Sequence, residues 1–400
     1  MTQATTCEYL VIGAGIIGLA IARELSMAQP KAKIIVVDKE NRIGMHASGR
    51  NSGVLHAGFY YAPDSLKAAL TRDGNTLLRD FLSEHKVSLR ECGKVVVASN
   101  ESQLSALDEL DRRGKANGVE LYSISERELH DLEPKARTHD RALWSPSTAV
   151  ADPTEVIAAL LADVRTRGID VRLGEPVTTI SRTTVTTSAA EYSPGHIVNC
   201  AGLYADRIAT MAGLEHPYVM LPFKGLYWHS NLPAGFLTRH VYPVPDPRNP
   251  FLGVHATVTV NGEMKIGPTA IPALSRENYD MFGGMSGRDL GEVARYLPQF
   301  LSSPHHEARK LIASEVPKYL KHKLVEQAAH LIPGLTSSMF DHRLKPGIRA
   351  QLFDKSKKSL EMDFVVHNQE NCTHVLNAVS PAWTSSLAFA KHVVAGISRS

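Results

Sequence analysis

The chain has 400 residues, of which 43% are hydrophobic and 21% charged, and its formal net charge at pH 7 is +3. This length predicts about two domains with sizeable cores, and the composition is typical of a globular enzyme. The small net charge, without Lys/Arg runs interleaved with aromatic residues, argues against a nucleic-acid partner.

The cysteines and the N-terminus predict a cytoplasmic protein. Cys7, Cys92, Cys200 and Cys372 are scattered without CxxC spacing, so we expect reduced thiols in the core and predict no metal site. The N-terminus lacks the basic region of a signal peptide. The longest apolar segment, residues 9–22, is broken by glycines and too short to span a bilayer.

The first predicted element is a strand, glycine turn and helix in residues 8–25, EYLVIGAGIIGLAIAREL. In this pattern Gly13 permits the tight turn, Gly15 admits a pyrophosphate, and Gly18 lets the helix pack on the strand. A second apolar run, residues 34–37, ends at Asp38, where the fold places the acid that binds an adenosine ribose. The spacing therefore predicts a dinucleotide site, and by itself it fits NAD as well as FAD.

The next informative segment is a long loop, residues 44–61, GMHASGRNSGVLHAGFYY. Its glycine, serine and asparagine content predicts many free backbone N–H groups, and long loops of this kind often carry function. His56, Tyr60 and Tyr61 follow it directly and could form a wall against a planar ligand. The alternative is a surface loop with a buried histidine.

Hydrophobic periodicity places the elements that follow. We expect helices over residues 64–85, 101–117 and 154–167, with a capping box of Ser125 and Glu128 before another helix. Short strands are expected over residues 95–98, 171–173, 177–187 and 197–200, the last ending in Ala201 and Gly202.

Residues 216–340 differ in composition from the rest of the chain, because they are rich in proline and contain scattered tyrosine and tryptophan residues. Alternating stretches over 252–260 and 263–267 predict antiparallel strands, and residues 300–335 read as helical. Their expected apolar face consists of Leu311, Ile312, Val316, Leu320, Leu324 and Ala328. A basic amphipathic helix of this kind lies either on an anionic membrane or against another domain.

The C-terminal part contains residues 345–352, a run over 359–366, and LNAVSPAWTSSLAFAKHVV over 376–394. A turn over 377–381 precedes a helix opened by Thr384, Ser385 and Ser386, whose N–H groups can face an anionic ring oxygen. This helix favours FAD over NAD.

Several longer pieces carry a resemblance. They are SGRNSGVLHAGFYY (48–61), SLKAAL (65–70), LPFKGLYW (221–228), YPVPDPRNPFLGVHAT (242–257), IGPTA (266–270), GIRAQL (347–352) and LNAVSPAWTSSLA (376–388). With them the chain resembles the D-amino-acid-oxidase-like FAD oxidoreductases and, within these, the L-2-hydroxyglutarate dehydrogenase/oxidase family, over nearly its whole length. It departs from that family at Thr71, Leu226, Trp228 and Trp383, where relatives usually have cysteine, glutamate, tyrosine and a smaller residue.

The resemblance implies an α/β fold, α+β overall, with a Rossmann-type FAD-binding domain and an inserted, mainly antiparallel substrate domain. We assign residues 1–90, 150–215 and 340–400 to the FAD-binding domain and residues 91–149 and 216–339 to the substrate-binding domain. The residues expected to bind FAD are Gly13, Ala14, Gly15, Ile16, Ile17, Gly18, Asp38, Lys39, Ser48, Asn51, Ser52, Gly53, Val54, Val177, Ala201, Gly202, Gly347, Arg349, Pro381, Ala382, Thr384 and Ser385.

The implied reaction is the oxidation of L-2-hydroxyglutarate to 2-oxoglutarate, with hydride transfer from the substrate Cα to flavin N5. The base for the hydroxyl proton is His56 or His255, and Arg349 holds the C1 carboxylate. Of the two histidines, His56 is favoured for contact with the flavin and His255 for proton transfer. The distal carboxylate is assigned to Tyr60, Tyr61, Lys224 and Tyr242.

Electrons would pass to a membrane quinone or to oxygen, and a basic helix over residues 305–330 would allow peripheral contact with the inner face of the membrane. Two alternatives remain at this point. One is a related flavoenzyme for an amino acid, an amine or glycerol 3-phosphate, and the other is a non-catalytic flavoprotein.

Overall fold

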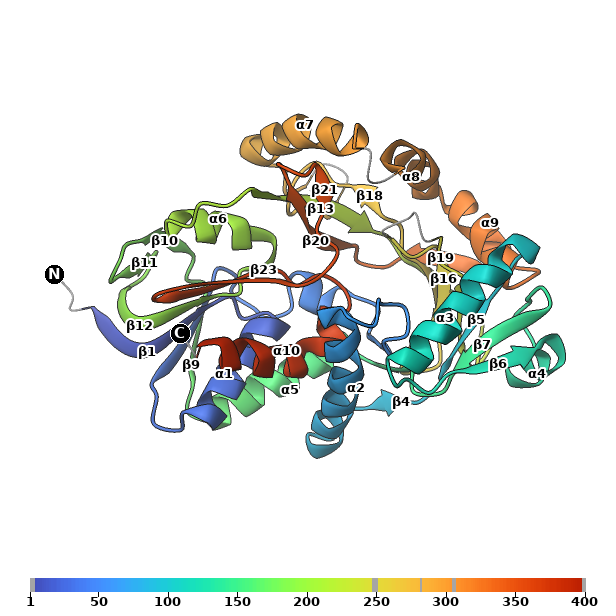
Figure 1. Ribbon diagram of the computed structural model, residues 1–400, viewed down its shortest axis with the longest axis horizontal. Coiled ribbons are helices and arrows are strands. Elements are labelled where there is room, and N and C mark those ends of the chain that lie inside the picture. Colours follow the sequence, from blue (N-terminus) through green and yellow to red (C-terminus); the bar gives the residue numbers. More distant parts are fainter. Residues whose placement is uncertain (1–3, 247–250, 281–282, 304–306, 398–400) are drawn as a thin grey trace.

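The computed structural model describes the chain except residues 1–3, 247–250, 281–282, 304–306 and 398–400. Part of the 242–257 motif and the start of the predicted 305–330 helix lie outside the described residues. The described elements form two halves side by side, one around a mainly parallel sheet and the other around antiparallel sheets (Figure 1).

The sheet of the first half has the spatial order β10-β11-β12-β1-β2-β9, with β23 paired to β12 and β22 to β23. Its central strand β1 runs parallel to both β2 and β12, and β12 runs parallel to β23. This confirms the α/β fold, and the predicted 197–200 strand, part of β12, lies beside β1. The strands are β1 (Thr5–Ile12), β2 (Ile34–Asp38), β9 (Asp170–Leu173), β10 (Val177–Ile180), β11 (Val185–Thr187), β12 (Glu191–Asn199), β22 (Val365–Gln369) and β23 (Cys372–Asn377).

Helices cover both faces of this sheet. Successive side chains of a strand point to opposite faces, so Val11 packs with α1, α2, α5 and α10, whereas Leu10 and Ile12 pack on the side of α6. Figure 1 shows α1, α5 and α10 below the sheet and α6 above it. The helices are α1 (Ile16–Ala28), α2 (Leu66–Glu84), α5 (Pro153–Thr166), α6 (Ala205–Met211) and α10 (Ala382–Ile397).

Local capping explains where several predicted helices begin. The Ser65 side chain accepts a hydrogen bond from Ala68 N–H at the start of α2. The predicted capping box of Ser125 and Glu128 is confirmed at α4 (Glu126–Leu132). The predicted 101–117 helix is a 3₁₀ turn, η2 (Glu101–Gln103), followed by α3 (Leu104–Ala116).

The second half contains two sheets whose pairings are antiparallel except that between β5 and β15, and a third, small antiparallel sheet packs on the core of the first half. The largest has the order β19 (Phe340–Arg343), β14 (Trp228–Ser230), β17 (Met264–Gly267), β16 (His255–Val258), β15 (His240–Pro243), β5 (Lys94–Val97), β7 (Arg141–Ser145) and β6 (Tyr122–Ser125). The second has the order β18 (Ile271–Pro272), β13 (Tyr218–Gly225), β20 (Gly347–Asp354) and β21 (Ser359–Leu360), and the third β3 (Val54–Leu55), β8 (Ala149–Ala151) and β4 (Leu89–Arg90).

We keep the division into two domains as a proposal, with one boundary moved. Strands β19, β20 and β21, from residues 340–360, pair with β14 and β13 of the second half. Because of these strand pairings, we assign β19, β20 and β21 to the substrate domain rather than to the FAD-binding domain.

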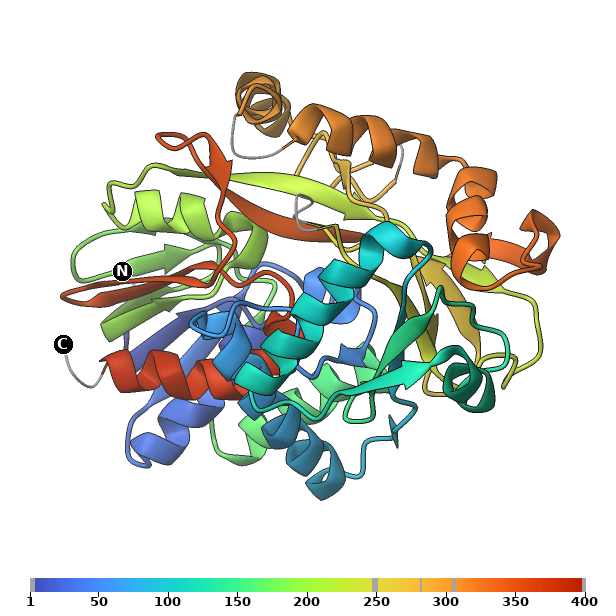
Figure 2. The ribbon, with the colours of Figure 1, turned by 45° about the vertical axis from the view of Figure 1, so that its right-hand side comes forward.

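The helical region after residue 286 differs from the prediction. A single helix over 305–330 is wrong, because the described chain forms α8 (Ala308–Glu315), η4 (Val316–Tyr319) and α9 (Lys321–Leu331), with Pro317 at the break. Another helix, α7 (Gly287–Leu301), was not expected from the sequence, and it contains Pro298 near its C-terminal end. Both views place α7, α8 and α9 along the outer rim of the second half (Figure 1 and Figure 2).

The break divides the predicted apolar face. Leu311, Leu324 and Ala328 are buried, whereas Val316 and Leu320 are exposed. Within the described ranges, none of the helices has the length and apolar character needed to cross a membrane. All four cysteines are buried and free, as predicted.

Candidate active site

A cavity of about 670 Å³ lies at the carboxyl ends of β1, β2 and β12 and extends to the N-terminus of α10. Cavities of about 300–1,000 Å³ are typical of small-molecule and cofactor sites. Its position, at the ends of parallel strands, is where open α/β sheets bind ligands.

The glycine turn after β1 has no space for side chains. Gly13 has a φ of +111°, and a Cβ there would lie 2.4 Å from the Cys200 carbonyl oxygen. A Cβ at Gly18 would lie 1.9 Å from the Gly13 oxygen, so α1 packs directly on the turn. Helix α1 has Gly15 as its N-cap and no acid in its first turn, so no carboxylate opposes an anion at its positive end.

Asp38 ends β2 at the cavity wall, as predicted. Its carboxylate accepts the Ala14 N–H at 2.6 Å and the Glu40 N–H at 2.8 Å, and these bonds fix its position beside the glycine turn. Ser48, from the long loop, accepts the Ile16 N–H at 2.9 Å. The loop is therefore anchored to the first turn of α1.

Most residues predicted to bind the cofactor border this cavity, and their roles stay predictions. Those at the cavity wall are Gly13, Gly15, Ile16, Ile17, Asp38, Lys39, Ser48, Asn51, Ser52, Val54, Val177, Ala201, Gly202, Gly347, Arg349, Pro381, Ala382 and Thr384. Four others, Ala14, Gly18, Gly53 and Ser385, lie outside the cavity wall. Gly18 and Gly53 instead permit close backbone approach, to Gly13 and Ala151 respectively.

Thr384 connects the N-terminus of α10 to the long loop. Its hydroxyl donates to the Val54 carbonyl at 3.1 Å and accepts the His56 N–H at 3.1 Å. This pair of bonds holds His56 at the cavity wall. Trp383, one of the departures from the family pattern, also borders the cavity.

His56 presents an unprotonated imidazole to the cavity. Burial and the charges of Lys94 and His255 lower its pKa to about 3, so the imidazole is neutral at pH 7. Its ring nitrogens have no hydrogen-bond partner among the described residues. A neutral, unpaired imidazole at a cavity wall has a lone pair available for substrate.

His255, on β16, is close enough to His56 to affect its pKa, but it does not border the cavity. Its Nδ1 donates to the Gly253 carbonyl at 2.8 Å, so the lone pair is on Nε2. The Tyr242 ring stacks on it at 3.8 Å between centroids. Burial, opposed by the Gly253 bond and assisted by Lys94, Arg349 and Lys265, lowers the pKa of His255 to about 3.

Arg349, on β20, borders the cavity, and its guanidinium lies 4.7 Å from the centre of the Phe251 ring. It makes no salt bridge within the described parts of the chain. Burial lowers its pKa from the ordinary value, but a guanidinium remains charged at neutral pH. An arginine that faces a cavity without a protein carboxylate is suited to bind a ligand carboxylate.

Two buried lysines near these groups were missed from the sequence. Lys94 is fully buried, and its ammonium has no hydrogen-bond partner in the described chain. It lies 4.5, 4.4 and 4.9 Å from the ring centres of Phe59, Tyr60 and Tyr242. Lys265 donates to the Ser52 carbonyl at 3.0 Å. For Lys94, the sequence signal that could have revealed its burial is its place at the start of the apolar run KVVVA.

The residues predicted for the distal carboxylate are placed differently. Lys224 donates to Asn278 Oδ1 at 3.0 Å and to the Asp280 carbonyl at 2.9 Å, so its ammonium is directed elsewhere. Tyr60 and Tyr242 surround Lys94, and Tyr61 is close enough to Arg349 to affect its pKa. None of these four borders the cavity.

We call Lys94, Lys265, Arg349, His56 and His255 the basic cluster. Burial lowers the pKa of Lys94 to about 7 and that of Lys265 to about 8. The carboxylates that affect the pKa of a cluster member are Asp152, for Lys265, and Glu315, for Arg349. Glu315 is itself paired with Lys318. The region therefore has an excess of positive charge that a dianionic ligand would neutralise.

Comparisons with known proteins agree with this geometry. Residues 8–395 match the family described as FAD dependent oxidoreductase. The chain is 35% identical to "L-2-hydroxyglutarate dehydrogenase, mitochondrial" of Caenorhabditis elegans, over 96% of this chain and 92% of that one. It is 32% identical to L-2-hydroxyglutarate dehydrogenase of Escherichia coli K12, over 98% and 93%.

Among solved structures, the fold is similar to dithionite-reduced L-alpha-glycerophosphate oxidase from Mycoplasma pneumoniae, which has FAD bound. The TM-score is 0.75 at 23% identity, covering 97% of this chain and 94% of that one. At this identity the likeness concerns the fold alone.

Proposed function

The chain belongs to the FAD-dependent oxidoreductase family and, within it, to the L-2-hydroxyglutarate dehydrogenases, and from this we infer that it oxidises L-2-hydroxyglutarate to 2-oxoglutarate. The observation that carries the substrate assignment is the basic cluster. A 2-hydroxy dicarboxylate brings two negative charges, whereas an amine substrate would need an acid that the described cluster does not offer.

The residues at the nucleotide end of the cavity fit FAD. The turn at Gly13 excludes a side chain, the N-terminus of α1 has no acid that would oppose a pyrophosphate, and Asp38 is fixed where a ribose is bound. We assign the opposite end of the cavity, at the N-terminus of α10, to the flavin ring. When bound, FAD supplies the acceptor for the two electrons that leave the substrate carbon.

The remaining chemistry belongs to the protein's own side chains. Arg349 binds and orients the C1 carboxylate through its planar fork of donors. His56 accepts the hydroxyl proton at the cavity wall, with His255 as the alternative base. Burial, assisted by the charge of Lys94, keeps both imidazoles unprotonated before substrate arrives. Lys94 and Lys265 contribute the positive field that attracts the distal carboxylate.

A substrate panel tests this function. The purified, FAD-loaded protein is mixed anaerobically with L-2-hydroxyglutarate, D-2-hydroxyglutarate, glycerol 3-phosphate or D-amino acids, and the flavin absorbance is followed. We expect bleaching by L-2-hydroxyglutarate at a rate at least about 100-fold above that of the others, because hydride transfer requires both carboxylates to be held with the Cα hydrogen directed at the flavin, which the D enantiomer and the other compounds do not satisfy. Equal or faster bleaching by glycerol 3-phosphate, also a dianion, would assign the cavity to a phosphate ester.

We further propose a quinone as electron acceptor and weak peripheral contact with a membrane. An exposed apolar patch of Val316, Tyr319 and Leu320 at the η4–α9 junction supports the contact. Exposed Lys323 and half-buried Lys321 follow it directly and suit an anionic surface. This patch replaces the continuous amphipathic helix expected from the sequence.

Vesicle sedimentation tests the contact. We expect the protein to sediment with anionic vesicles at low salt, and a Val316→Ser/Leu320→Ser double variant to lose at least half of that binding, because burial of these side chains drives it. Met362→Ser, which removes an exposed apolar side chain elsewhere, is the matched control. Equal binding by all three proteins, or none by the wild type, would contradict the proposal.

A further inference from the structure

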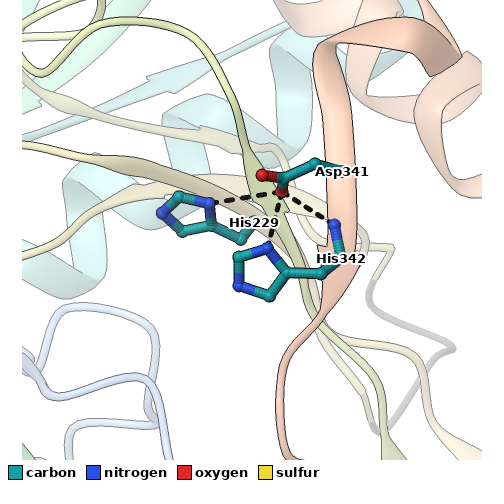
Figure 3. Close-up of side chains that lie close together, drawn as sticks. All are labelled: His229, Asp341 and His342. Atoms are coloured by element: carbon teal, nitrogen blue, oxygen red, sulfur yellow. Dashed lines mark hydrogen bonds and ion pairs between the residues drawn. The ribbon is translucent and has the colours of Figure 1, made fainter.

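The largest sheet carries a cluster of potential metal ligands that the reaction does not use. His229 lies on β14, and Asp341 and His342 lie on β19, the edge strand beside it. One nitrogen or oxygen from each of the three lies within 4.8 Å of the others. Figure 3 shows the two imidazoles directed toward the Asp341 carboxylate.

A β-bulge brings the three side chains together. His229 pairs with His342, whereas the next residue, Ser230, pairs with Phe340, so Asp341 is an extra residue in β19. In a regular strand Asp341 and His342 would point to opposite faces. The bulge turns both toward His229, and bulges commonly redirect side chains at functional sites.

We propose that His229 Nδ1, the Asp341 carboxylate and His342 Nδ1 bind one Zn²⁺ ion, with water as the fourth ligand. Two imidazoles and a carboxylate are a donor set that zinc accepts, at bond lengths of about 2.0–2.2 Å. In a tetrahedral site such ligand atoms lie ~3.4 Å apart. Asp341 Oδ1 is 3.5 Å from His229 Nδ1 and 2.7 Å from His342 Nδ1, so a small side-chain adjustment suffices.

The surroundings of His229 match those of a metal-bound histidine. Its Nε2 lies 3.5 Å from a carboxylate oxygen of Glu263, and a carboxylate beside the second ring nitrogen is typical of a metal-bound histidine. Nδ1 is buried and has no hydrogen-bond partner among the described residues, only the 3.5 Å approach to Asp341. A buried lone pair aimed at a carboxylate is costly unless a proton or a cation lies between them.

The charge of the cluster also suits a dication. With neutral imidazoles, Asp341 and Glu263 give two negative charges, and the ammonium of Lys265, the cross-strand neighbour of His229, is bound to the Ser52 carbonyl. A second group, Glu40, His46 and Glu277, is different, because Lys39 bridges both of its carboxylates and His46 is bonded to Tyr279. A cation already occupies that position.

Zinc titration of the FAD-loaded protein after chelator treatment tests the proposal. We expect one Zn²⁺ per chain, and a melting temperature raised by at least about 2 °C at saturating zinc, because the ion joins the edge strand β19 to β14. His229→Gln, Asp341→Asn and His342→Gln should each weaken binding by at least about 10-fold. His330→Gln, which removes an exposed histidine on α9, is the matched control and should bind like the wild type.

Anomalous diffraction at the zinc edge then locates the ion. A peak between His229 and His342 supports the proposal, whereas a peak elsewhere, or zinc binding that all three substitutions leave unchanged, overturns it. The rate of flavin reduction in the three variants should stay within about threefold of the wild type, since none of these side chains borders the cavity. The test is therefore independent of the proposed reaction.

Discussion

We expect the His56→Gln variant to reduce its bound flavin about 10²- to 10⁴-fold more slowly than the wild type, under anaerobic conditions at saturating L-2-hydroxyglutarate. The reason is that His56 combines a place at the cavity wall with a neutral, unpaired imidazole. Stopped-flow absorbance measures the rate, and the flavin absorbance before mixing checks that FAD is retained. His322→Gln, on the exposed face of α9, is the control.

His255→Gln separates the two candidate bases. A larger loss in His255→Gln than in His56→Gln would assign proton transfer to His255 Nε2, as the sequence analysis favoured. Less than a few-fold loss in both variants would exclude the histidines and direct attention to Tyr227, which also borders the cavity.

The lowered pKa of His56 predicts how the rate of flavin reduction changes with pH. A base whose pKa is lowered to about 3 stays unprotonated in mild acid, so the second-order rate constant for flavin reduction should not fall between pH 7 and pH 5. An unperturbed histidine would lose activity through pH 6.5. Because the charge of Lys94 helps to lower the pKa of His56, Lys94→Met should move the acidic limb to higher pH.

Substitution of Arg349 by alanine should raise the Kd for L-2-hydroxyglutarate by about 30- to 1,000-fold, with a smaller effect on the rate at saturation. Loss of one partner of a buried, hydrogen-bonded charge pair costs about 2–4 kcal/mol. Titration of the flavin spectrum with a non-reacting dicarboxylate analogue gives the Kd directly. Arg349→Lys, which keeps the charge but loses the planar fork, should recover only part of the affinity.

Stability separates a binding role from a structural one. Arg349 makes no salt bridge in the described chain, so its removal leaves no carboxylate unpaired and should lower the melting temperature by less than about 2 °C. Lys318→Met gives the contrast, because it leaves the buried Glu315 without its ammonium and should destabilise the fold by about 3–5 kcal/mol. A large loss of stability in Arg349→Ala with unchanged Kd would contradict the carboxylate assignment.

The sequence predicted elements whose cause is local. The strand, glycine turn and helix at residues 8–25 and the capping box at Ser125 depend on residues a few positions apart, and the acid at Asp38 depends on a fixed spacing within one strand-helix-strand unit. The single helix over 305–330 failed for a local reason as well, because Pro317 interrupts it. The hydrophobic periodicity of the sequence continues across Pro317, but a proline lacks the N–H that an uninterrupted helix needs at that position.

The sequence by itself determined that this chain folds around a dinucleotide site, because a tight turn, a close phosphate approach and a ribose acid are encoded by residue type and spacing. Only the tertiary structure decided how the reactive groups combine. His56, Lys94, His255 and Arg349 come from four segments. Their burial, rather than their residue type, makes the histidines neutral, and within the described chain it leaves the two cations without a carboxylate in a salt bridge. Likewise, Asp341 and His342 face His229 because strand pairing contains a bulge, which no spacing in the sequence reveals.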